Sequence, residues 1–313
     1  MDALNTESIS FSQHLATIYV ETQRLASKIC KENYGVTLTQ FELLLTLQQA
    51  TDPLMVRSLS EFLFLKPASV RLLASELEDE GLVATRSAES DQRFAVVELT
   101  EAGAARTLAC DEEVSAFFGM TTRAQLPEQE FHRHFFDQIA QSLDFARGYG
   151  SSIEMDPTRV GGMRVEFHVF SRVLIERWRG CVASRCEMSF NEFRALYALV
   201  GTPSLRVQDL AAELSVTRSQ ASTFRKRLAG LGFAQERPNP FDGRSVLLAA
   251  TKEGVRFVRA VQPELDRITS ITHDTGSAEG NMTLRSWHSR MYLNLRRFLA
   301  SGRQLDASDK QIL

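Results

Sequence analysis

The stretch GLVATRSAESDQRFAVVELTEAG, residues 81–103, has a counterpart in GFAQERPNPFDGRSVLLAATKEG, residues 232–254. Extended toward the N-terminus, residues 54–103 and 205–254 align without a gap at an offset of 151, with eleven identities in fifty positions. The identical residues of the first copy are Leu54, Val56, Leu59, Leu63, Leu77, Gly81, Arg86, Asp91, Arg93, Thr100 and Gly103. Because internal repetition of this kind marks a structural unit built more than once, the chain is predicted to contain two copies of one domain.

Each quoted stretch has the pattern of a β-hairpin that follows a helix. Residues 82–86 with 96–99, and 233–237 with 246–249, are β-like segments on either side of a polar turn. Gly81 and Gly232 stand where a left-handed residue ends the preceding helix. Ahead of each hairpin, and again after Thr100 and Thr251, apolar residues recur at helical spacing.

Helical periodicity and end signals give the same order of helices in both copies. A helix is predicted at 9–31 and at 164–183, followed by a second helix capped by Thr39 or Ser189 and closed by Pro53 or Pro203. Short extended segments at 54–56 and 205–207 come next. Later helices are predicted at 58–64, 67–80, 101–118 and 128–147, and at 209–214, 218–231, 252–271 and 284–299, with Ser58 and Asp209 as N-caps.

Composition limits the class of protein and divides the charge unequally. The length of 313 residues suits two domains, predicted at 1–149 and 159–313 with a linker at 150–158. Residues 1–150 carry 12 basic and 22 acidic side chains, whereas residues 151–313 carry 24 and 17, so only the second half is expected to attract a polyanion. The alternative is that surface charge drifted after duplication. The sequence predicts neither a signal peptide nor a membrane span, so a cytoplasmic location is expected.

Two short helices, a tight turn between them and then a hairpin form the order of a winged helix-turn-helix. With Gly81-Leu82-Val83, Arg86, Asp91-Gln92-Arg93 and Thr100-Glu101-Ala102-Gly103, the chain resembles the MarR family of bacterial transcription regulators. Gly232-Phe233, Arg237, Asp242-Gly243-Arg244 and Thr251-Lys252-Glu253-Gly254 repeat this pattern. The resemblance implies a mainly α fold with small β-wings, in which long helices interlock two winged helices as a pseudo-twofold dimer within one chain. It also implies recognition helices one DNA turn, about 34 Å, apart.

The resemblance implies contacts to double-stranded DNA from the recognition helices and the wings. Asp91 and Asp242 would brace wing arginines; alternatively, they only stabilise the hairpin turns. The expected DNA contacts are Ser69, Arg71, Ser75, Arg86, Arg93, Thr217, Arg218, Gln220, Ser222, Arg225, Lys226, Arg227, Arg237 and Arg244. The acids at 76, 78, 79 and 80 oppose phosphate binding by the first copy, so an asymmetric operator is expected.

Relatives of this type also suggest ligand control and redox sensing. A small aromatic or anionic ligand would be lined by Tyr19, Phe41, Phe170, Phe193 and Tyr197, although aromatic residues on an apolar helix face usually belong to the core. Cys30, Cys181 and Cys186 are candidate redox thiols, with buried inert thiols as the alternative. No metal-ligand spacing, cofactor motif or catalytic motif is found, so neither metal nor cofactor nor enzyme activity is predicted.

These features predict a transcription regulator that acts as a monomeric pseudo-dimer and is released from DNA by a small molecule. The other hypothesis is a ligand-sensing or protein-interaction module that kept the fold and lost DNA binding in one or both copies. The acidic segment at residues 76–80 favours this second hypothesis.

Overall fold

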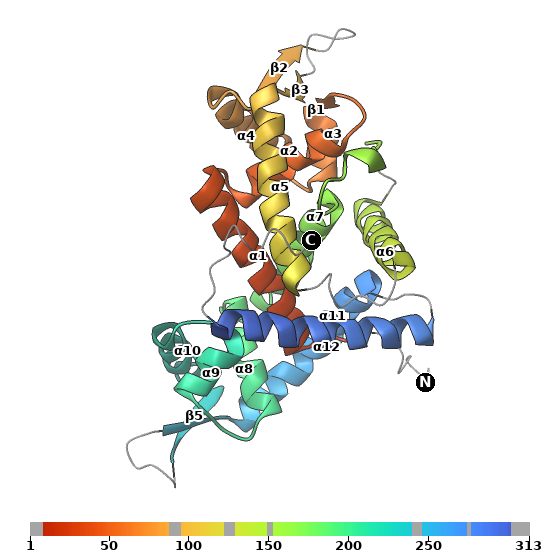
Figure 1. The fold of residues 1–313 in the computed structure, drawn as a ribbon. Coiled ribbons are helices and arrows are strands. Elements are labelled where there is room, and N and C mark those ends of the chain that lie inside the picture. The colour runs from red at the N-terminus through yellow and green to blue at the C-terminus, as the bar shows by residue number, and fades with distance from the viewer. Residues whose placement is uncertain are drawn as a thin grey trace. The chain divides into compact units, whose positions relative to one another are not determined.

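The computed structural model describes residues 9–87, 95–121, 129–148, 153–239, 246–273 and 277–301. Within these ranges the protein is mainly helical, with two small antiparallel sheets and a winged helix-turn-helix in each repeat (Figure 1). This is the fold class that the sequence predicts. No helix in the described part of the chain is long and apolar enough to cross a membrane.

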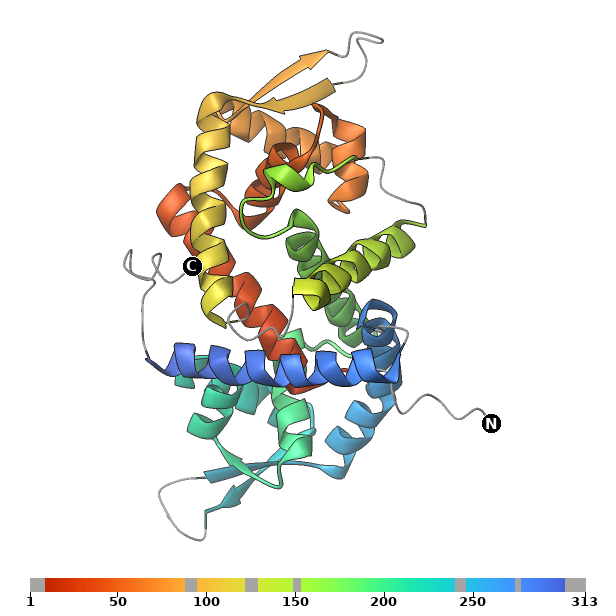
Figure 2. The ribbon, with the colours of Figure 1, turned by 45° about the vertical axis from the view of Figure 1, so that its right-hand side comes forward.

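The first repeat begins with two helices and continues through the winged helix. The elements are α1 (Gln13–Tyr34), α2 (Leu38–Gln49), β1 (Leu54–Met55), α3 (Val56–Phe62), α4 (Pro67–Asp79), β2 (Val83–Ser87), β3 (Ala95–Leu99), α5 (Glu101–Thr121) and α6 (Gln129–Arg147). The pair α3–α4 is the helix-turn-helix, and β2–β3 is the wing, which adjoins the start of α5 (Figure 2).

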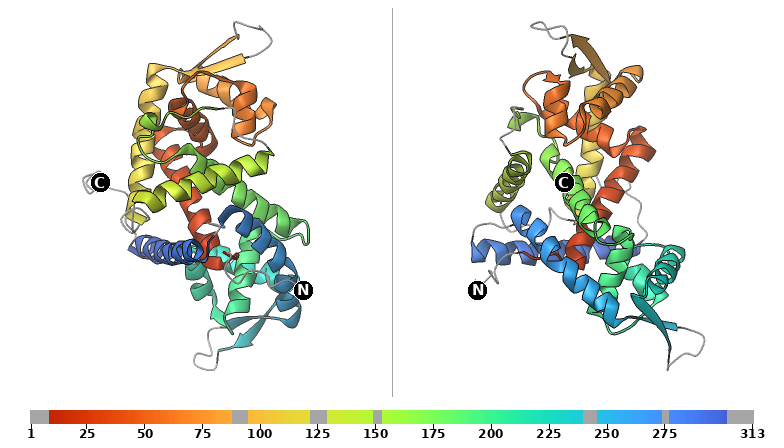
Figure 3. Two further views of the ribbon diagram at one scale, coloured as in Figure 1. Left: turned by 90° about the vertical axis from the view of Figure 1, so that its right-hand side faces the viewer. Right: turned by 180° about the vertical axis from the view of Figure 1, so that it is seen from behind.

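The second repeat has the same order after a short 3-10 helix, η2 (Pro157–Arg159). Its elements are α7 (Val165–Ala183), α8 (Phe190–Gly201), β4 (Leu205–Arg206), α9 (Val207–Leu214), α10 (Arg218–Gly230), β5 (Ala234–Pro238), β6 (Val246–Ala250), α11 (Lys252–His273) and α12 (Ala278–Ser301). Here α9–α10 is the helix-turn-helix, and α11 leaves the wing β5–β6 (Figure 3).

The two sheets are copies of each other in topology and register. Their strand orders are β1-β3-β2 and β4-β6-β5, all antiparallel. Arg86 pairs with Val96, and Arg237 pairs with Leu247. Since both partners shift by the same 151 positions, the gapless alignment of the sequence is also an alignment of the hydrogen-bonded ladders.

The glycines that end the recognition helices have the left-handed conformation that the sequence predicts. Gly81 has φ +71° and Gly232 has φ +72°, and the next amides, of Leu82 and Phe233, bond back to carbonyls of α4 and α10 at 2.8 and 2.9 Å. A side chain would be strained at this φ, which explains glycine in both copies.

Three predicted N-caps are wrong, while Ser189 is confirmed as the N-cap of α8. Thr37, not Thr39, caps α2 with a reciprocal bond to Gln40. The third helix of each repeat starts directly after its two-residue strand, at Val56 and Val207, so Ser58 and Asp209 lie inside it. The Asp209 carboxylate instead accepts a hydrogen bond from the backbone amide of the N-cap residue, Arg206, as the third helical residue of a capping box does.

The repeated Thr-x-x-Gly joins the wing to the following helix. The Thr100 hydroxyl donates to the Gly81 carbonyl at 2.7 Å and accepts from the Gly103 amide at 3.0 Å; Thr251 makes the equivalent bonds. A Cβ on Gly103 would lie 1.8 Å from the Leu82 carbonyl oxygen, and one on Gly254 would lie 2.3 Å from that of Phe233. The threonine and glycine of this motif are therefore required by the packing of the wing against the following helix.

The chain forms two compact bodies that do not coincide with the two repeats. The first-repeat body runs from Thr22 to Val173, and the second-repeat body holds the described residues up to Glu21 and those from Leu174 onward. The start of α1 thus packs with the second repeat, and the start of α7 packs with the first. In contrast, the domain boundary at residues 150–158 concerns the sequence repeats and stays a prediction.

The described part of the predicted linker is fixed to the first-repeat body. Met155 forms a β-bridge with Ala50, and Arg159 donates to the Ala50 carbonyl at 2.6 Å. The buried Gln49 side chain bonds the backbone of both Met163 and Val165, at 2.9 and 3.0 Å. From residue 153 onward the connection is therefore held by hydrogen bonds.

Candidate nucleic-acid interface

The second recognition helix, α10, begins with a complete capping box. The Thr217 side chain accepts from the Gln220 amide at 3.2 Å, and the Gln220 side chain accepts from the Thr217 amide at 2.9 Å. Both side chains are exposed. These two predicted DNA contacts thus also hold the N-terminus of the helix, where backbone amides favour an anion.

Helical spacing defines which residues of α10 point away from the protein. Ala221 and Leu228 are fully buried and mark the inner face. Opposite them lie the four exposed residues of the α10 outer stripe, which are Ser219, Thr223, Lys226 and Gly230. Of the predicted DNA contacts only Lys226 lies on this stripe, with Ser222 beside it.

Two predicted DNA contacts of α10 are engaged with the protein itself. The Arg225 guanidinium lies 3.6 Å from the Glu236 carboxylate on β5, and its side chain is 24% exposed. Arg227 donates to the Glu187 carbonyl at 2.7 Å. Ser219 and Thr223 were not among the predicted contacts, although the apolar positions Ala221 and Leu228 place them on the opposite face. Charge alone is therefore a poor guide to orientation.

The equivalent stripe on α4 is different in character. The α4 outer stripe consists of Ala68, Leu72, Ser75 and Asp79, each 151 positions before its α10 counterpart and each exposed. Leu72, with 61% of its surface exposed, replaces Thr223, and Ser75 replaces Lys226. The predicted contacts Ser69, Arg71 and Ser75 are all exposed, and only Ser75 belongs to the stripe.

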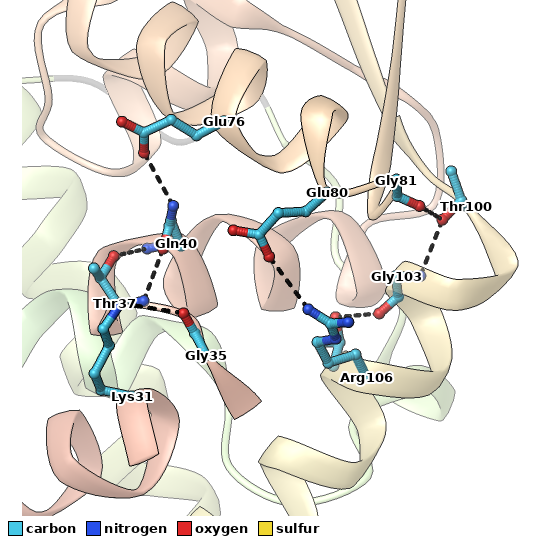
Figure 4. A network of polar contacts seen from close by, with 11 residues as sticks. Lys31, Gly35, Thr37, Gln40, Glu76, Glu80, Gly81, Thr100, Gly103 and Arg106 are labelled. Atoms are coloured by element: carbon cyan, nitrogen blue, oxygen red, sulfur yellow. Dashed lines mark hydrogen bonds and ion pairs between the residues drawn. The ribbon is translucent and has the colours of Figure 1, made fainter. Parts of the chain in front are cut away.

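Three of the acids at the end of α4 have structural partners in the first-repeat body. Glu76 accepts from the Gln40 side chain at 3.0 Å, and Glu80 accepts from Arg106 at 3.2 Å (Figure 4). Glu78 accepts from the Thr85 amide at the start of the wing at 2.7 Å. Asp79 is the acid that lies on the outer stripe. The four acids therefore do not form one repulsive surface.

The wings place Arg86 and Arg237 at equivalent exposed positions on β2 and β5. Arg86 lies 3.5 Å from Glu98 on β3, and both side chains are largely exposed, so this ion pair contributes little to stability. The predicted wing-tip residues Asp91, Arg93, Asp242 and Arg244 lie outside the described residues. Their roles stay predictions.

The five candidate ligand residues are distributed over the two bodies. Tyr19, Phe193 and Tyr197 belong to the second-repeat body, and Phe41 and Phe170 to the first-repeat body. All are buried except the half-buried Tyr197, and they pack against other aromatic rings or the core, as in the contact of Phe41 with His168 at 5.6 Å between ring centroids. Their role in ligand binding stays a prediction.

One buried polar pair in the second-repeat body was not predicted from sequence. The Tyr19 hydroxyl lies 2.8 Å from His273 Nε2, while His273 Nδ1 lies 3.1 Å from the Thr269 carbonyl. Because a carbonyl only accepts, Nδ1 carries the proton and Nε2 accepts from Tyr19. Burial lowers the pKa of His273 to about 4, so this imidazole is neutral near pH 7.

The candidate redox thiols have unequal surroundings. Cys30 is buried, and its sulfur lies 3.5 Å from that of Cys110, a residue that was not predicted. Burial raises the pKa of Cys181, although Arg185 lies 3.2 Å from its sulfur and acts in the opposite direction. Cys186 is half-buried. A redox role for any of them stays a prediction. Among the described residues no cluster of His, Cys, Asp or Glu suits a metal ion.

Comparison with known proteins identifies the type of the second winged helix. Residues 187–245, which include α8, the helix-turn-helix and β5 but end before β6, match the family model described as "MarR family". This winged helix is therefore of MarR type. No curated protein matches the chain.

Several solved structures align with less than half of the chain. A MarR protein from Peptoclostridium difficile is 17% identical with a TM-score of 0.40, covering 44% of this chain and 90% of that one. Sco3205 from Streptomyces coelicolor, a MarR family transcriptional regulator solved in complex with DNA, is 22% identical with a TM-score of 0.35, covering 44% and 82%. CouR from Rhodococcus jostii RHA1, bound to p-coumaroyl-CoA, is 20% identical with a TM-score of 0.36, covering 42% and 88%.

Proposed function

We propose that the protein is a DNA-binding transcription regulator in which one chain supplies both winged helices, and that its operator is asymmetric. The observation that carries this proposal is the contrast between the two recognition helices. Helix α10 contains four basic residues and no acid, whereas α4 contains one basic residue and three acids. The MarR-type match over residues 187–245 supports DNA binding by the second copy.

The chemistry of the α10 outer stripe suits the major groove. Lys226 supplies a positive charge, and Ser219 and Thr223 supply hydroxyl groups that bond phosphates or base edges. Arg218 lies in the first turn, where the helix dipole also favours phosphate. The α4 outer stripe offers Ser75 as a hydroxyl but places apolar Leu72 at its centre. We therefore expect base recognition mainly from α10.

Selection of binding sites from a random DNA pool with the full chain tests the proposal. The expected product is a site with one strongly preferred half and one weakly preferred half. A perfect inverted repeat with equal preference in both halves contradicts it. Titrating salt on the selected site then counts the phosphate contacts, because the slope of log K against log salt is about −0.9 per contact.

A second function, protein binding by the first winged helix, is favoured by Leu72. An apolar side chain that is 61% exposed at the centre of a recognition helix is unsuited to phosphate. Under this alternative, nuclease protection covers one half-site only, and Leu72→Ala leaves DNA affinity unchanged. Protection of two half-sites one helical turn apart supports the leading proposal instead.

Release by a small aromatic or anionic ligand belongs to the proposal on the strength of the family resemblance. A ligand that acts in this way must bind the free and DNA-bound forms with different affinity. Aromatic carboxylates are suitable probes. The expected result is one compound that raises the melting temperature of the protein and weakens DNA binding; compounds that bind and leave DNA affinity unchanged contradict it.

A further inference from the structure

The two repeats carry opposite charges at two pairs of equivalent positions, of which three are buried and one, Arg172, is half-buried. Glu21 in α1 corresponds to Arg172 in α7 at the offset of 151. Glu42 in α2 corresponds to Arg194 in α8 at an offset of 152, one more than elsewhere, since each is five residues after the N-cap of its helix. Charged side chains rarely occupy buried positions without a partner, so this reversal needs a structural reason.

In the first-repeat body, Arg172 fastens the start of α7 to the first repeat. Its Nε lies 2.8 Å from Glu42 Oε2, and a second nitrogen donates to the Leu63 carbonyl at 2.6 Å. The Glu42 side chain is fully buried and that of Arg172 is 13% exposed. A helix of the second repeat is thus held by an acid and a turn of the first repeat.

In the second-repeat body, the acid and the base have exchanged places. Arg194 of the second repeat is fully buried and donates to the Thr17 hydroxyl of α1 at 2.9 Å. Glu21, one turn further along α1, is 2% exposed. Burial lowers the pKa of Arg194 to about 10, and the negative charge of Glu21, followed by that of Glu213 in α9, acts in the opposite direction. Here a helix of the first repeat supplies the acid, and the second repeat supplies the base.

This exchange discriminates between pairing of unlike repeats and pairing of like repeats. If α1 docked on a first repeat, Glu21 would meet Glu42; if α7 docked on a second repeat, Arg172 would meet Arg194. Two like charges buried together cost far more than a paired acid and base, because neither is solvated or neutralised. Pairing rules of this kind depend on penalties against the wrong partner.

We propose that Glu21, Glu42, Arg172 and Arg194 form a charge pattern that lets each repeat dock only the first helix of the opposite repeat. Two chains are thereby prevented from associating through like repeats. Unlike repeats of the same chain meet first, because the short connection keeps them at high effective concentration. This pattern is independent of DNA binding, so it stands or falls separately from the proposed function.

The test reverses the charges on the docking helices alone. In the double variant Glu21→Arg/Arg172→Glu, docking between the two repeats of one chain brings charges of the same sign together. Docking between the first repeats, or between the second repeats, of two chains brings charges of opposite sign together. We expect the wild type to have the mass of one chain by light scattering and the double variant to have the mass of two. We also expect the double variant to unfold at lower urea when diluted.

The matched control restores complementarity with all four charges reversed. The quadruple variant, Glu21→Arg/Glu42→Arg/Arg172→Glu/Arg194→Glu, is expected to recover the mass of one chain and most of the wild-type urea midpoint. If the double variant fails to fold, the test is whether the quadruple variant recovers the mass of one chain and the urea midpoint. A double variant with wild-type mass and midpoint overturns the proposal, and so does a quadruple variant that recovers neither.

Discussion

The outer stripes of α4 and α10 occupy the same position in two copies of one fold, yet they share no residue. Helices α4 and α10 are followed by equivalent left-handed glycines, Gly81 and Gly232, and the two wings have the same register. The stripes themselves differ in charge and polarity. Lys226 is the sequence equivalent of Ser75, and Thr223 is the sequence equivalent of Leu72. Duplication within one chain allows such divergence, because a change in one copy no longer appears in both halves of a dimer.

Charge reversal at Lys226 is expected to have the largest effect on this comparison. Lys226→Glu should weaken binding to the selected site ~100-fold, because it removes a cation and places an anion near phosphate. The measurement is fluorescence anisotropy of labelled DNA at fixed salt. Ser75→Glu, the matched change in α4, should alter affinity no more than about threefold. Equal losses from both variants would show that the two helices contribute alike.

Acid is expected to weaken both bodies through their buried histidines. Burial lowers the pKa of His168, in the first-repeat body, and of His273, in the second, to about 4, against 6.5 when unfolded. The unfolded chain therefore takes up protons first. The contribution of these histidines to the free energy of unfolding is fully present above pH 6.5. It falls toward pH 4, by up to about 1.4 kcal/mol per pH unit for each histidine.

Urea unfolding at pH 7 and pH 5.5 measures this loss. His168→Gln and His273→Gln should each reduce the difference between the two midpoints, since glutamine does not titrate. His288 adds a second buried neutral imidazole to the second-repeat body, so this body is expected to respond more strongly. A pH response unchanged in both variants would assign acid sensitivity to other groups.

The N-termini of the two recognition helices should differ in their sensitivity to substitution. Thr217 caps α10 with its side chain, whereas Lys66 precedes α4 without a side-chain cap bond. Thr217→Ala is expected to cost about 1 kcal/mol of unfolding free energy, and Lys66→Ala less than about 0.5. Chemical denaturation gives both values. A larger loss from the Lys66 variant would contradict the difference in capping.

Transfer of the α10 stripe to α4 is expected to give the smallest change. Leu72→Thr/Ser75→Lys introduces the polar and basic groups of the second copy, so binding should tighten roughly threefold. Binding-site selection with this variant should return a more symmetric site than the wild type does. If affinity and symmetry stay unchanged, the first winged helix lies away from DNA.

Local signals were sufficient for most elements of the fold. The apolar spacing of 67–80 and 218–231, followed by Gly81 and Gly232, predicts α4 and α10 to within one residue. The misplaced starts at Ser58 and Asp209 arise because β1 and β4 are only two residues long and pass directly into helices. For α2, the sequence offers two threonines, and the reciprocal bond to Gln40 identifies Thr37 rather than Thr39 as the cap.

The orientation of the predicted DNA-contact residues depends on tertiary packing, and their contacts to DNA stay predictions. Arg227 is of a residue type that often contacts DNA, but it donates a hydrogen bond to the Glu187 carbonyl, forty positions away in sequence. Ser219 and Thr223 were not among the predicted contacts, although both lie opposite the buried Ala221. Which side of a helix is free depends on what packs against the other side, and composition does not contain that information.

The sequence by itself determined the duplication, the order of helices and the presence of two wings, because caps, helix-ending glycines and apolar spacing act within a few residues. Only the tertiary structure decided that the first helix of each repeat divides between two bodies. It also paired Arg172 with Glu42 across 130 positions. A buried ion pair of this kind is selected by the desolvation of both charges at once, and that condition exists only after the distant segments have packed together.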